Sequence, residues 1–252
     1  MMEIITPDWI DAPDNIGAFT TLRSGGVSLT PYDDGVTGRK GLNLAAHAGD
    51  DPDDVQQNRS LLRPLLPTEP AWLTQVHGTR VVDAANVRNA PEADASISKE
   101  KGVVCVTLTA DCLPVLFCDA KGTVVAAAHA GWRGLADGIL EQTVREMRAA
   151  GAADILAWLG PAIGPKKFEV GDDVRDAFLV RAETMQEAFT PMNGRPGKYL
   201  ADIYLLARKT LGAVGVDRVS GGGSCTVTDA HRFYSFRRNP ITGRMASLIW
   251  LK

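Results

Sequence analysis

Apolar and polar residues alternate along this chain in patterns that predict both strands and helices. Short apolar runs bounded by turn residues predict strands at residues 103–109, 155–160 and 245–251, and a hairpin around Asp119-Ala120-Lys121-Gly122. Apolar residues at helical spacing predict helices at 52–63, 135–147, 172–188 and 199–211. Asp51 is the expected N-cap of the first helix, with Pro52 as its first residue. Since strands and helices follow no strict βαβ order, we expect a mixed α/β (α+β) layered domain spanning residues 1–252.

The predicted hairpin brings two reactive side chains together. If Asp119 faces Gly122 across the turn, antiparallel pairing places Cys112 opposite His129. Directly opposite residues have Cβ atoms about 4.5–5.5 Å apart. That separation suits a thiolate and an imidazole that share one metal ion, and it equally suits a cysteine nucleophile with a histidine base. Both chemistries stay open at this point.

Two further segments carry candidate site residues. Residues 71–83 are expected to form a hairpin whose turn contains His77 and Gly78, where the histidine is either a ligand or an ordinary turn residue. The corner Ala130-Gly131-Trp132-Arg133-Gly134 precedes a predicted helix and offers free N–H groups and a guanidinium. This corner is a candidate anion site, unless its glycines serve only close packing.

Composition and charge narrow the functional class. A net charge of −3 over 252 residues provides no electrostatic reason to bind nucleic acid or an anionic membrane. The first residues do not resemble a signal peptide, and no apolar run reaches the length of a membrane span. Cys105, Cys112, Cys118 and Cys225 show no CxxC spacing and are expected to be reduced thiols. We therefore expect a cytoplasmic protein.

Several segments together resemble one bacterial family. They are LNLAAHAGDDPDDVQQNR, TQVHG, ADAS, TADCLPVLFCD, AAAHAGWRG, GPAIGP, FEVGDDV, and FYSFRR followed by TGRM. In this order they resemble, over most of the chain, the family variously named polyphenol oxidase (laccase domain), purine nucleoside phosphorylase and peptidoglycan editing factor. The resemblance implies an α/β/β/α sandwich and a metal site formed by His77, Cys112 and His129.

Such a ligand set determines which chemistry is available. Two imidazoles and one thiolate leave the fourth position of a zinc ion open, which is typical of a catalytic site, and zinc there acts as a Lewis acid and lowers the pKa of bound water. A closed structural site would need Cys118 or Cys225 as fourth ligand. The same three ligands also occur in blue-copper centres, so Cu²⁺ is an alternative to Zn²⁺. With only four histidines, however, the chain lacks the ligands of an ordinary multicopper oxidase, which needs roughly ten.

The leading hypothesis drawn from the resemblance is a zinc-dependent phosphorylase of purine nucleosides. Adenosine or inosine and phosphate would give the base and ribose 1-phosphate, with methylthioadenosine and adenosine deamination as further activities. Arg133 would hold an anion, Asn43, Arg59 and Arg238 would contact substrate, and Asp111 would tune a metal-bound group or point to the opposite face of its strand. The signature of known zinc deaminases, H-x-E with P-C-x-x-C, is absent, which weakens deamination as a main role.

Three alternatives remain open beside the phosphorylase. One is hydrolysis of an amide in a cell-wall precursor, either with the metal or with Cys112 as nucleophile and His129 as base. Another is polyphenol oxidation by copper as a side activity. A third is a zinc-stabilised interaction module without catalysis, for which Cys112 would be essential to folding. The expected assembly is a monomer or a homodimer.

Overall fold

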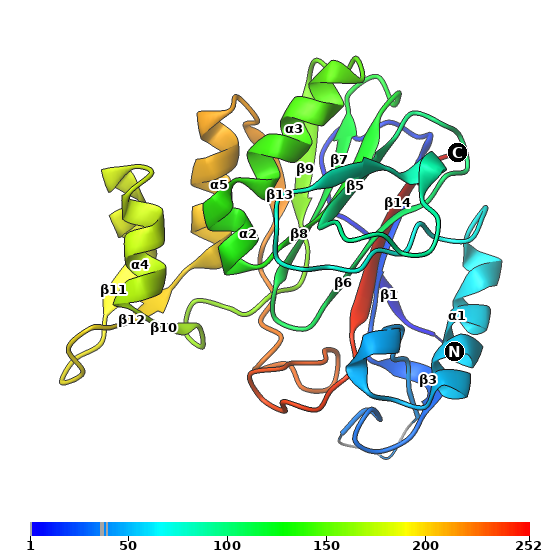
Figure 1. Cartoon of the computed structure of the whole chain (residues 1–252), viewed down its shortest axis with the longest axis horizontal. Coiled ribbons are helices and arrows are strands. Elements are labelled where there is room, and N and C mark those ends of the chain that lie inside the picture. Colours follow the sequence, from blue (N-terminus) through cyan, green and yellow to red (C-terminus); the bar gives the residue numbers. More distant parts are fainter. Residues whose placement is uncertain (1, 36–37, 39) are drawn as a thin grey trace.

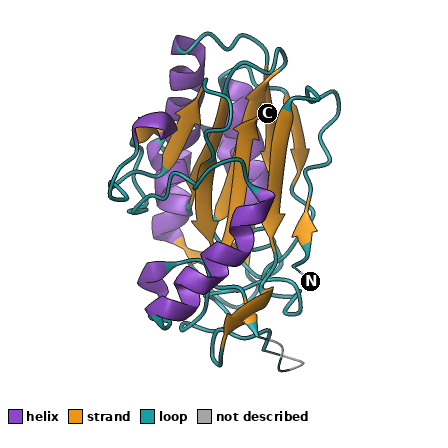
Figure 2. Cartoon of the chain, turned by 90° about the vertical axis from the view of Figure 1, so that its right-hand side faces the viewer, coloured by secondary structure: helices purple, strands orange, loops and turns teal. Residues whose placement is uncertain are grey.

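The computed structural model describes residues 2–35, 38 and 40–252. Two larger β-sheets lie face to face, and helices cover their outer surfaces (Figure 1, Figure 2). The strands are β1 (Ile4–Ile5), β2 (Ile16–Thr21), β3 (Ser24–Ser28), β4 (Val81–Asp83), β5 (Ala95–Ser98), β6 (Cys105–Thr109), β7 (Leu113–Asp119), β8 (Val125–Ala130), β9 (Ile155–Leu159), β10 (Glu169–Gly171), β11 (Phe189–Pro191), β12 (Lys198–Ala201), β13 (Arg218–Gly221) and β14 (Met245–Leu251). The α-helices are α1 (Pro52–Leu62), α2 (Trp132–Asp137), α3 (Ile139–Ala149), α4 (Asp172–Leu179) and α5 (Ile203–Ala213). The expected α/β/β/α sandwich is confirmed.

The sheets divide the chain into layers. One sheet has the strand order β1-β2-β14-β6 and the other has the order β13-β9-β7-β8-β5-β4. Helix α1 lies outside the first sheet, whereas α3 and α5 lie outside the second (Figure 1). A small sheet, β10-β12-β11, lies next to α4 at one end of the molecule (Figure 1). Among the described residues, no helix is long and apolar enough to cross a membrane.

Alternation along the central strands explains why both faces of each large sheet are buried. In β7, Leu116 and Cys118 belong to the core between the two sheets, while Val115 and Phe117 belong to the core under α3 and α5. In β14, Ile249 faces the space between the sheets. Successive side chains of a strand point to opposite faces, so a strand in the middle of a four-layer sandwich must be apolar throughout.

The hairpin between β7 and β8 forms, but the predicted register is wrong by two residues. Asp119 pairs with Val124 rather than with Gly122, since the Asp119 N–H donates to the Val124 carbonyl at 3.1 Å. His129 is consequently opposite Pro114, and Cys112 lies just before the first residue of β7. The Asp119 carboxylate causes the wider turn, because it accepts hydrogen bonds from the N–H groups of Thr123 at 2.6 Å and Val124 at 2.8 Å.

We predict that replacing Asp119 with alanine lowers the free energy of unfolding by about 2–4 kcal/mol, because buried N–H groups then lose a charged acceptor. Asp119 is only 1% exposed and also accepts from the Thr123 hydroxyl at 3.0 Å. Urea unfolding measures the change, with Lys121→Ala, an exposed substitution in the same turn, as control. Equal stability of the two variants would show that the carboxylate does not hold the turn.

The prediction of a hairpin at residues 71–83 is wrong. Ala71 and Thr74 make isolated parallel bridges to Cys105 and Glu92, and only β4 is a strand, parallel to β5. The N–H groups of residues 76, 77 and 78 donate instead to the carboxylate of Asp94. Because these N–H groups already donate to a side chain, they cannot form the hydrogen bonds between strands that a hairpin requires, and the segment is a loop.

Helix boundaries follow local caps that the apolar spacing does not reveal. Asp51 accepts from the Asp53 N–H, which confirms the predicted N-cap of α1. One helix was expected at 135–147, but Gly138 has a φ of 103°, ends α2 and precedes α3. The expected helix at 172–188 becomes α4 and a 3₁₀-helix at Glu183–Ala188, and α5 starts only at Ile203, where Asp202 accepts from the Leu205 N–H.

Candidate active site

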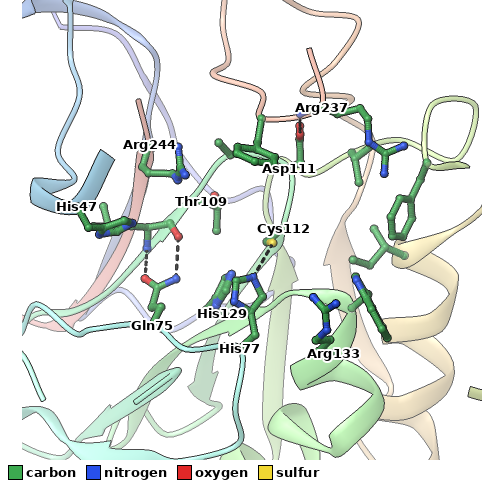
Figure 3. Close-up of a pocket in the computed structure, with 17 residues that line it drawn as sticks. His47, Gln75, His77, Thr109, Asp111, Cys112, His129, Arg133, Arg237 and Arg244 are labelled. Carbon is green, nitrogen blue, oxygen red and sulfur yellow. Dashed lines mark hydrogen bonds between the residues drawn. The ribbon is translucent and has the colours of Figure 1, made fainter. Parts of the chain in front are cut away.

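Three side chains from separate parts of the chain converge at one end of the six-stranded sheet. His77 comes from the loop before β4, Cys112 from the residue before β7, and His129 from the end of β8. Their ligating atoms all lie within 4.8 Å of one another, and Cys112 Sγ is 3.7 Å from His77 Nε2 (Figure 3). The expected trio is therefore brought together, although the hairpin register differs. A shift of two residues keeps Cys112 on the same side of the sheet, since side chains alternate with period two.

Gly131 makes this close approach possible. A Cβ atom at this position would lie 2.7 Å from the Cδ2 of His77 and 3.1 Å from the Sγ of Cys112. Any other residue would push the loop that carries His77 away from the thiol. The backbone nearby is also strained, because His77 and Asp111 both have positive φ values, 61° and 91°.

Asp94 connects two of the three candidate ligands. Its carboxylate accepts from the N–H groups of His77 at 2.9 Å and Gly78 at 2.7 Å, and its Oδ1 lies 2.8 Å from His129 Nδ1. Asp94 is 1% exposed and His129 is 3% exposed. A carboxylate that binds one ring nitrogen orients the other nitrogen toward a metal, which is the usual outer support of a histidine ligand.

The charges of these groups stabilise one another. Burial raises the pKa of Cys112, but attraction to His129 and hydrogen bonds with both histidines outweigh it, so the pKa is lowered. Burial lowers the pKa of His129, but attraction to Cys112 and the hydrogen bond with Asp94 outweigh it, so this pKa is raised. Both shifts favour a thiolate paired with an imidazolium over a neutral thiol paired with a neutral imidazole. The thiolate is the form that binds soft metal ions and that acts as a nucleophile.

The donor set fits a transition metal with an open position. Two imidazoles and a thiolate suit zinc and also copper. In the part of the chain that the structure describes, the other cysteines do not complete the set: Cys118 belongs to the core between the sheets, and Cys225 accepts from the Gly164 N–H at 3.3 Å. Among the described residues, a closed structural site with a second cysteine as fourth ligand is therefore not formed.

A pocket of about 500 Å³ opens onto the three ligands (Figure 3). This volume is in the range of small-molecule sites. Its polar wall consists of His47, Gln75, His77, Thr109, Asp111, Cys112, His129, Arg133, Arg237 and Arg244. Its apolar wall consists of Leu108, Ala110, Trp132, Ile163, Phe168, Ile203 and Phe236.

Three arginines bring positive charge to the wall of the pocket. Arg133 lines it and lies over the ring of Trp132 at 4.5 Å. Arg237 lies over Phe168 at 5.8 Å, and Arg244 is fixed by hydrogen bonds to the carbonyls of residues 242 and 243. Helix α2 has only six residues, so the guanidinium rather than the helix dipole accounts for the positive charge at this corner.

Asp111 lines the pocket, but its carboxylate is used within the protein. It accepts from the hydroxyl of Thr226 at 2.5 Å, from the hydroxyl of Ser235 at 3.1 Å and from the N–H of Arg237 at 2.6 Å. The side chain thus points toward the segment of residues 226–238. Asp111 thereby fixes the backbone beside Cys112.

Asn43, Arg59 and Arg238 do not line this pocket. Asn43 is buried and donates to Asp50 at 3.0 Å, while its Oδ1 accepts from the Arg244 N–H at 3.0 Å. Arg59 donates to the Leu44 carbonyl at 2.9 Å. Arg238 donates to carbonyls of residues 226, 227 and 233. In this structure all three hold the backbone that surrounds the pocket.

The sequence did not indicate several residues of the site. Asp94 lies in the quoted ADAS segment, and a lone acid between alanines before a buried strand is the signal that would have marked it. Arg237 and Arg244 lie in the quoted FYSFRR and TGRM segments, in which no sequence pattern marks them as residues of the pocket. Gln75 binds the backbone of Leu108 through both its amide nitrogen and oxygen, at 2.8 and 2.7 Å, and no sequence pattern predicts that contact.

Comparison with known proteins agrees with the resemblance. Residues 17–252 match the family described as multi-copper polyphenol oxidoreductase laccase. A Pseudomonas aeruginosa protein named purine nucleoside phosphorylase is 54% identical over 98% of each chain. An Escherichia coli protein named purine nucleoside phosphorylase YfiH is 51% identical over 100% of each chain.

Solved structures support the same fold. A crystal structure of a Neisseria meningitidis protein superposes with a TM-score of 0.91 at 47% identity and covers 99% of each chain. The structure of YlmD from Geobacillus stearothermophilus superposes with a TM-score of 0.81 at 31% identity and covers 95% of this chain and 93% of that one.

Proposed function

This chain belongs to the multi-copper polyphenol oxidoreductase laccase family, and we propose that it is a zinc-dependent purine nucleoside phosphorylase. Inosine or adenosine and phosphate would be converted into the free base and ribose 1-phosphate, with methylthioadenosine as a further substrate. One observation carries the proposal: a single pocket combines three arginines, aromatic side chains and the His77, Cys112 and His129 trio. The names of relatives at 54% and 51% identity support it.

The pocket suits the two substrates of phosphorolysis. A purine is a flat ring system, and the rings of Trp132 and Phe168 line the pocket as aromatic surfaces against which it would pack. Phosphate carries negative charge and needs a cation, which the arginines of the pocket provide. During the reaction a phosphate oxygen bonds to the anomeric carbon of the ribose while the bond from that carbon to the base breaks.

The residues of the chain would position these groups. His77, Cys112 and His129 would hold zinc, which supplies Lewis-acid stabilisation of negative charge on a bound oxygen. Asp94 keeps the His129 ring in place, and Asp111 fixes the backbone beside Cys112. Four free cysteines fit a reducing compartment, so we place the reaction in the cytosol.

The direct test measures bound metal and phosphate-dependent release of hypoxanthine from inosine. We expect close to one zinc ion per wild-type chain, with product formed only when phosphate is present. His77→Ala should lose the zinc, and its activity should fall by more than a hundredfold. Even the replacement of residues that only support metal ligands lowers metal affinity or activity about ten- to hundredfold. His231→Ala, an exposed histidine outside the trio, is the matched control and should retain both.

Zinc-loaded wild type that forms no product in the presence of phosphate would contradict the phosphorylase assignment.

Copper-dependent phenol oxidation and adenosine deamination are proposed only as side activities. All four histidines lie in the part of the chain that the structure describes, and there only His77 and His129 belong to the ligand group, which is too few for a multicopper cluster.

Amide hydrolysis is the second candidate, and one arrangement favours it. Cys112, His129 and Asp94 follow one another as nucleophile, base and orienting carboxylate. A metal-free thiol hydrolase, acting for instance on a cell-wall precursor, would keep its activity in a chelator and in His77→Ala. Loss of activity under either condition excludes that version.

A further inference from the structure

The hydroxyl of Thr109 has no hydrogen-bond partner among the described residues. Thr109 is 2% exposed, and its Oγ1 is buried. A buried hydroxyl without a partner is costly, and most such groups in folded proteins are satisfied. Because Thr109 lines the pocket, a molecule bound there is the natural partner.

The surroundings of Thr109 are cationic and polar. Thr109 pairs with Met245 between β6 and β14, directly beside Arg244, and Cys112 follows three residues later. Arg244 and His47 line the same pocket as the metal-ligating trio, and in the view of Figure 3 Thr109 lies between Arg244 and Cys112.

The two ends of the pocket differ in character. In Figure 3, His47 and Arg244 lie on one side of Cys112, and Arg133 and Arg237 lie on the other. Arg133 and Arg237 lie over the rings of Trp132 and Phe168, and Arg244 lies over the ring of Phe236 at 6.0 Å. The end with Trp132 and Phe168 offers two rings to a purine, whereas the end with Thr109 and His47 offers polar groups to a small oxyanion.

We propose that Thr109, Arg244 and His47 form the phosphate subsite, in which the Thr109 hydroxyl donates to a phosphate oxygen. This assignment rests on the proposed phosphorylase function and adds the position of the second substrate. The nucleoside then occupies the other end, and the reacting atoms meet beside the metal ligands.

Thr109→Val tests the assignment, because valine has nearly the same shape and lacks the hydroxyl. We expect the KM for phosphate to rise roughly tenfold to a hundredfold, as for a lost hydrogen bond to a charged group, with the KM for inosine unchanged. The melting temperature without phosphate should not fall, since the removed hydroxyl has no protein partner. Thr109→Ser, which keeps a hydroxyl, should recover most of the lost phosphate affinity.

Thr210→Val is the matched control. Thr210, in α5, is 1% exposed, its hydroxyl is also without a partner among the described residues, and it does not line the pocket. Its replacement should leave both KM values unchanged. If Thr109→Val lowers the melting temperature and leaves the phosphate KM unchanged, the hydroxyl has a structural role and the proposal fails. If only the KM for inosine rises, the hydroxyl contacts the nucleoside and the proposal also fails.

Calorimetric titration of the zinc-loaded variants with inorganic phosphate separates this proposal from the proposed function. If wild type binds phosphate at least tenfold more tightly than the Thr109→Val variant does, but does not turn over inosine, the result supports the subsite and contradicts the phosphorylase. Turnover with equal phosphate affinity in both proteins supports the phosphorylase and overturns the subsite. If wild type neither binds phosphate nor turns over inosine, both fail.

Discussion

Replacing Cys112 with alanine is expected to abolish turnover in a chain that still folds. Cys112 is half-buried and lies outside β7, so its side chain contributes little to the core. In a chelator, we expect the free energy of unfolding to change by less than about 1 kcal/mol, as for substitutions away from the core. Zinc binding and activity should fall by more than a hundredfold, beyond the effect typical of residues that only support a ligand.

Circular dichroism, metal analysis and inosine phosphorolysis together measure these effects. Cys225→Ala is the matched control, since this cysteine is also half-buried and lies outside the ligand group. If Cys112→Ala is unfolded under conditions in which Cys225→Ala is folded, the metal is a structural element and the chain is better described as a zinc-stabilised module.

Replacing Asp94 with asparagine should have the second-largest effect. Asparagine can accept hydrogen bonds only through Oδ1, so it cannot satisfy all the N–H groups at 76, 77 and 78 and also orient His129. We expect zinc affinity and activity to fall about ten- to hundredfold. Competition with a chromophoric chelator measures the affinity.

Asp119→Asn is the matched control for Asp94→Asn. Asp119 is an equally buried carboxylate that accepts several N–H groups at the far end of β7 and β8. The Asp119→Asn substitution should lower the free energy of unfolding without weakening zinc binding. If both variants bind zinc as tightly as wild type, Asp94 does not support the ligands.

Asp94→Asn should also change how the stability of the chain depends on pH. Burial raises the pKa of Asp94, but the hydrogen bonds with His129 and Gly78 outweigh it, so the pKa is lowered. A lowered carboxyl pKa stabilises the folded chain above the ordinary value of about 4, and this contribution is lost as the pH falls through the folded-state pKa. Metal-free Asp94→Asn should lack that part of the acid-dependent loss of stability.

Patterns along the chain predict the buried strands well, because burial of both sheet faces requires apolar strands, whereas the α/β/β/α order of the layers came from the family resemblance. The strands at 103–109 and 245–251 and the N-cap at Asp51 follow directly from local rules. The register of the β7–β8 hairpin does not, because the hydrogen bonds that Asp119 accepts set the turn length. An error of two residues still leaves Cys112 on the correct side of the sheet, whereas an error of one would not.

Contacts between distant segments account for what the sequence could not reveal. Asp94 binds a loop 16 to 18 residues before it and a strand 35 residues after it. That carboxylate, rather than a hairpin, places His77. Likewise, Arg59 and Arg238 meet the carbonyl groups that they bind only when the chain folds. Residue spacing in the sequence therefore cannot distinguish arginines that hold the backbone from arginines that face the pocket.

The most direct measurement is X-ray absorption at the zinc edge of the zinc-loaded chain, compared with the same protein carrying His77→Ala. The wild-type spectrum should show zinc bound by one sulfur and two imidazole nitrogens, together with a light atom that the protein does not supply. A zinc ion bound by two sulfurs, by four protein atoms, or in surroundings that His77→Ala leaves unchanged would contradict an open site formed by His77, Cys112 and His129.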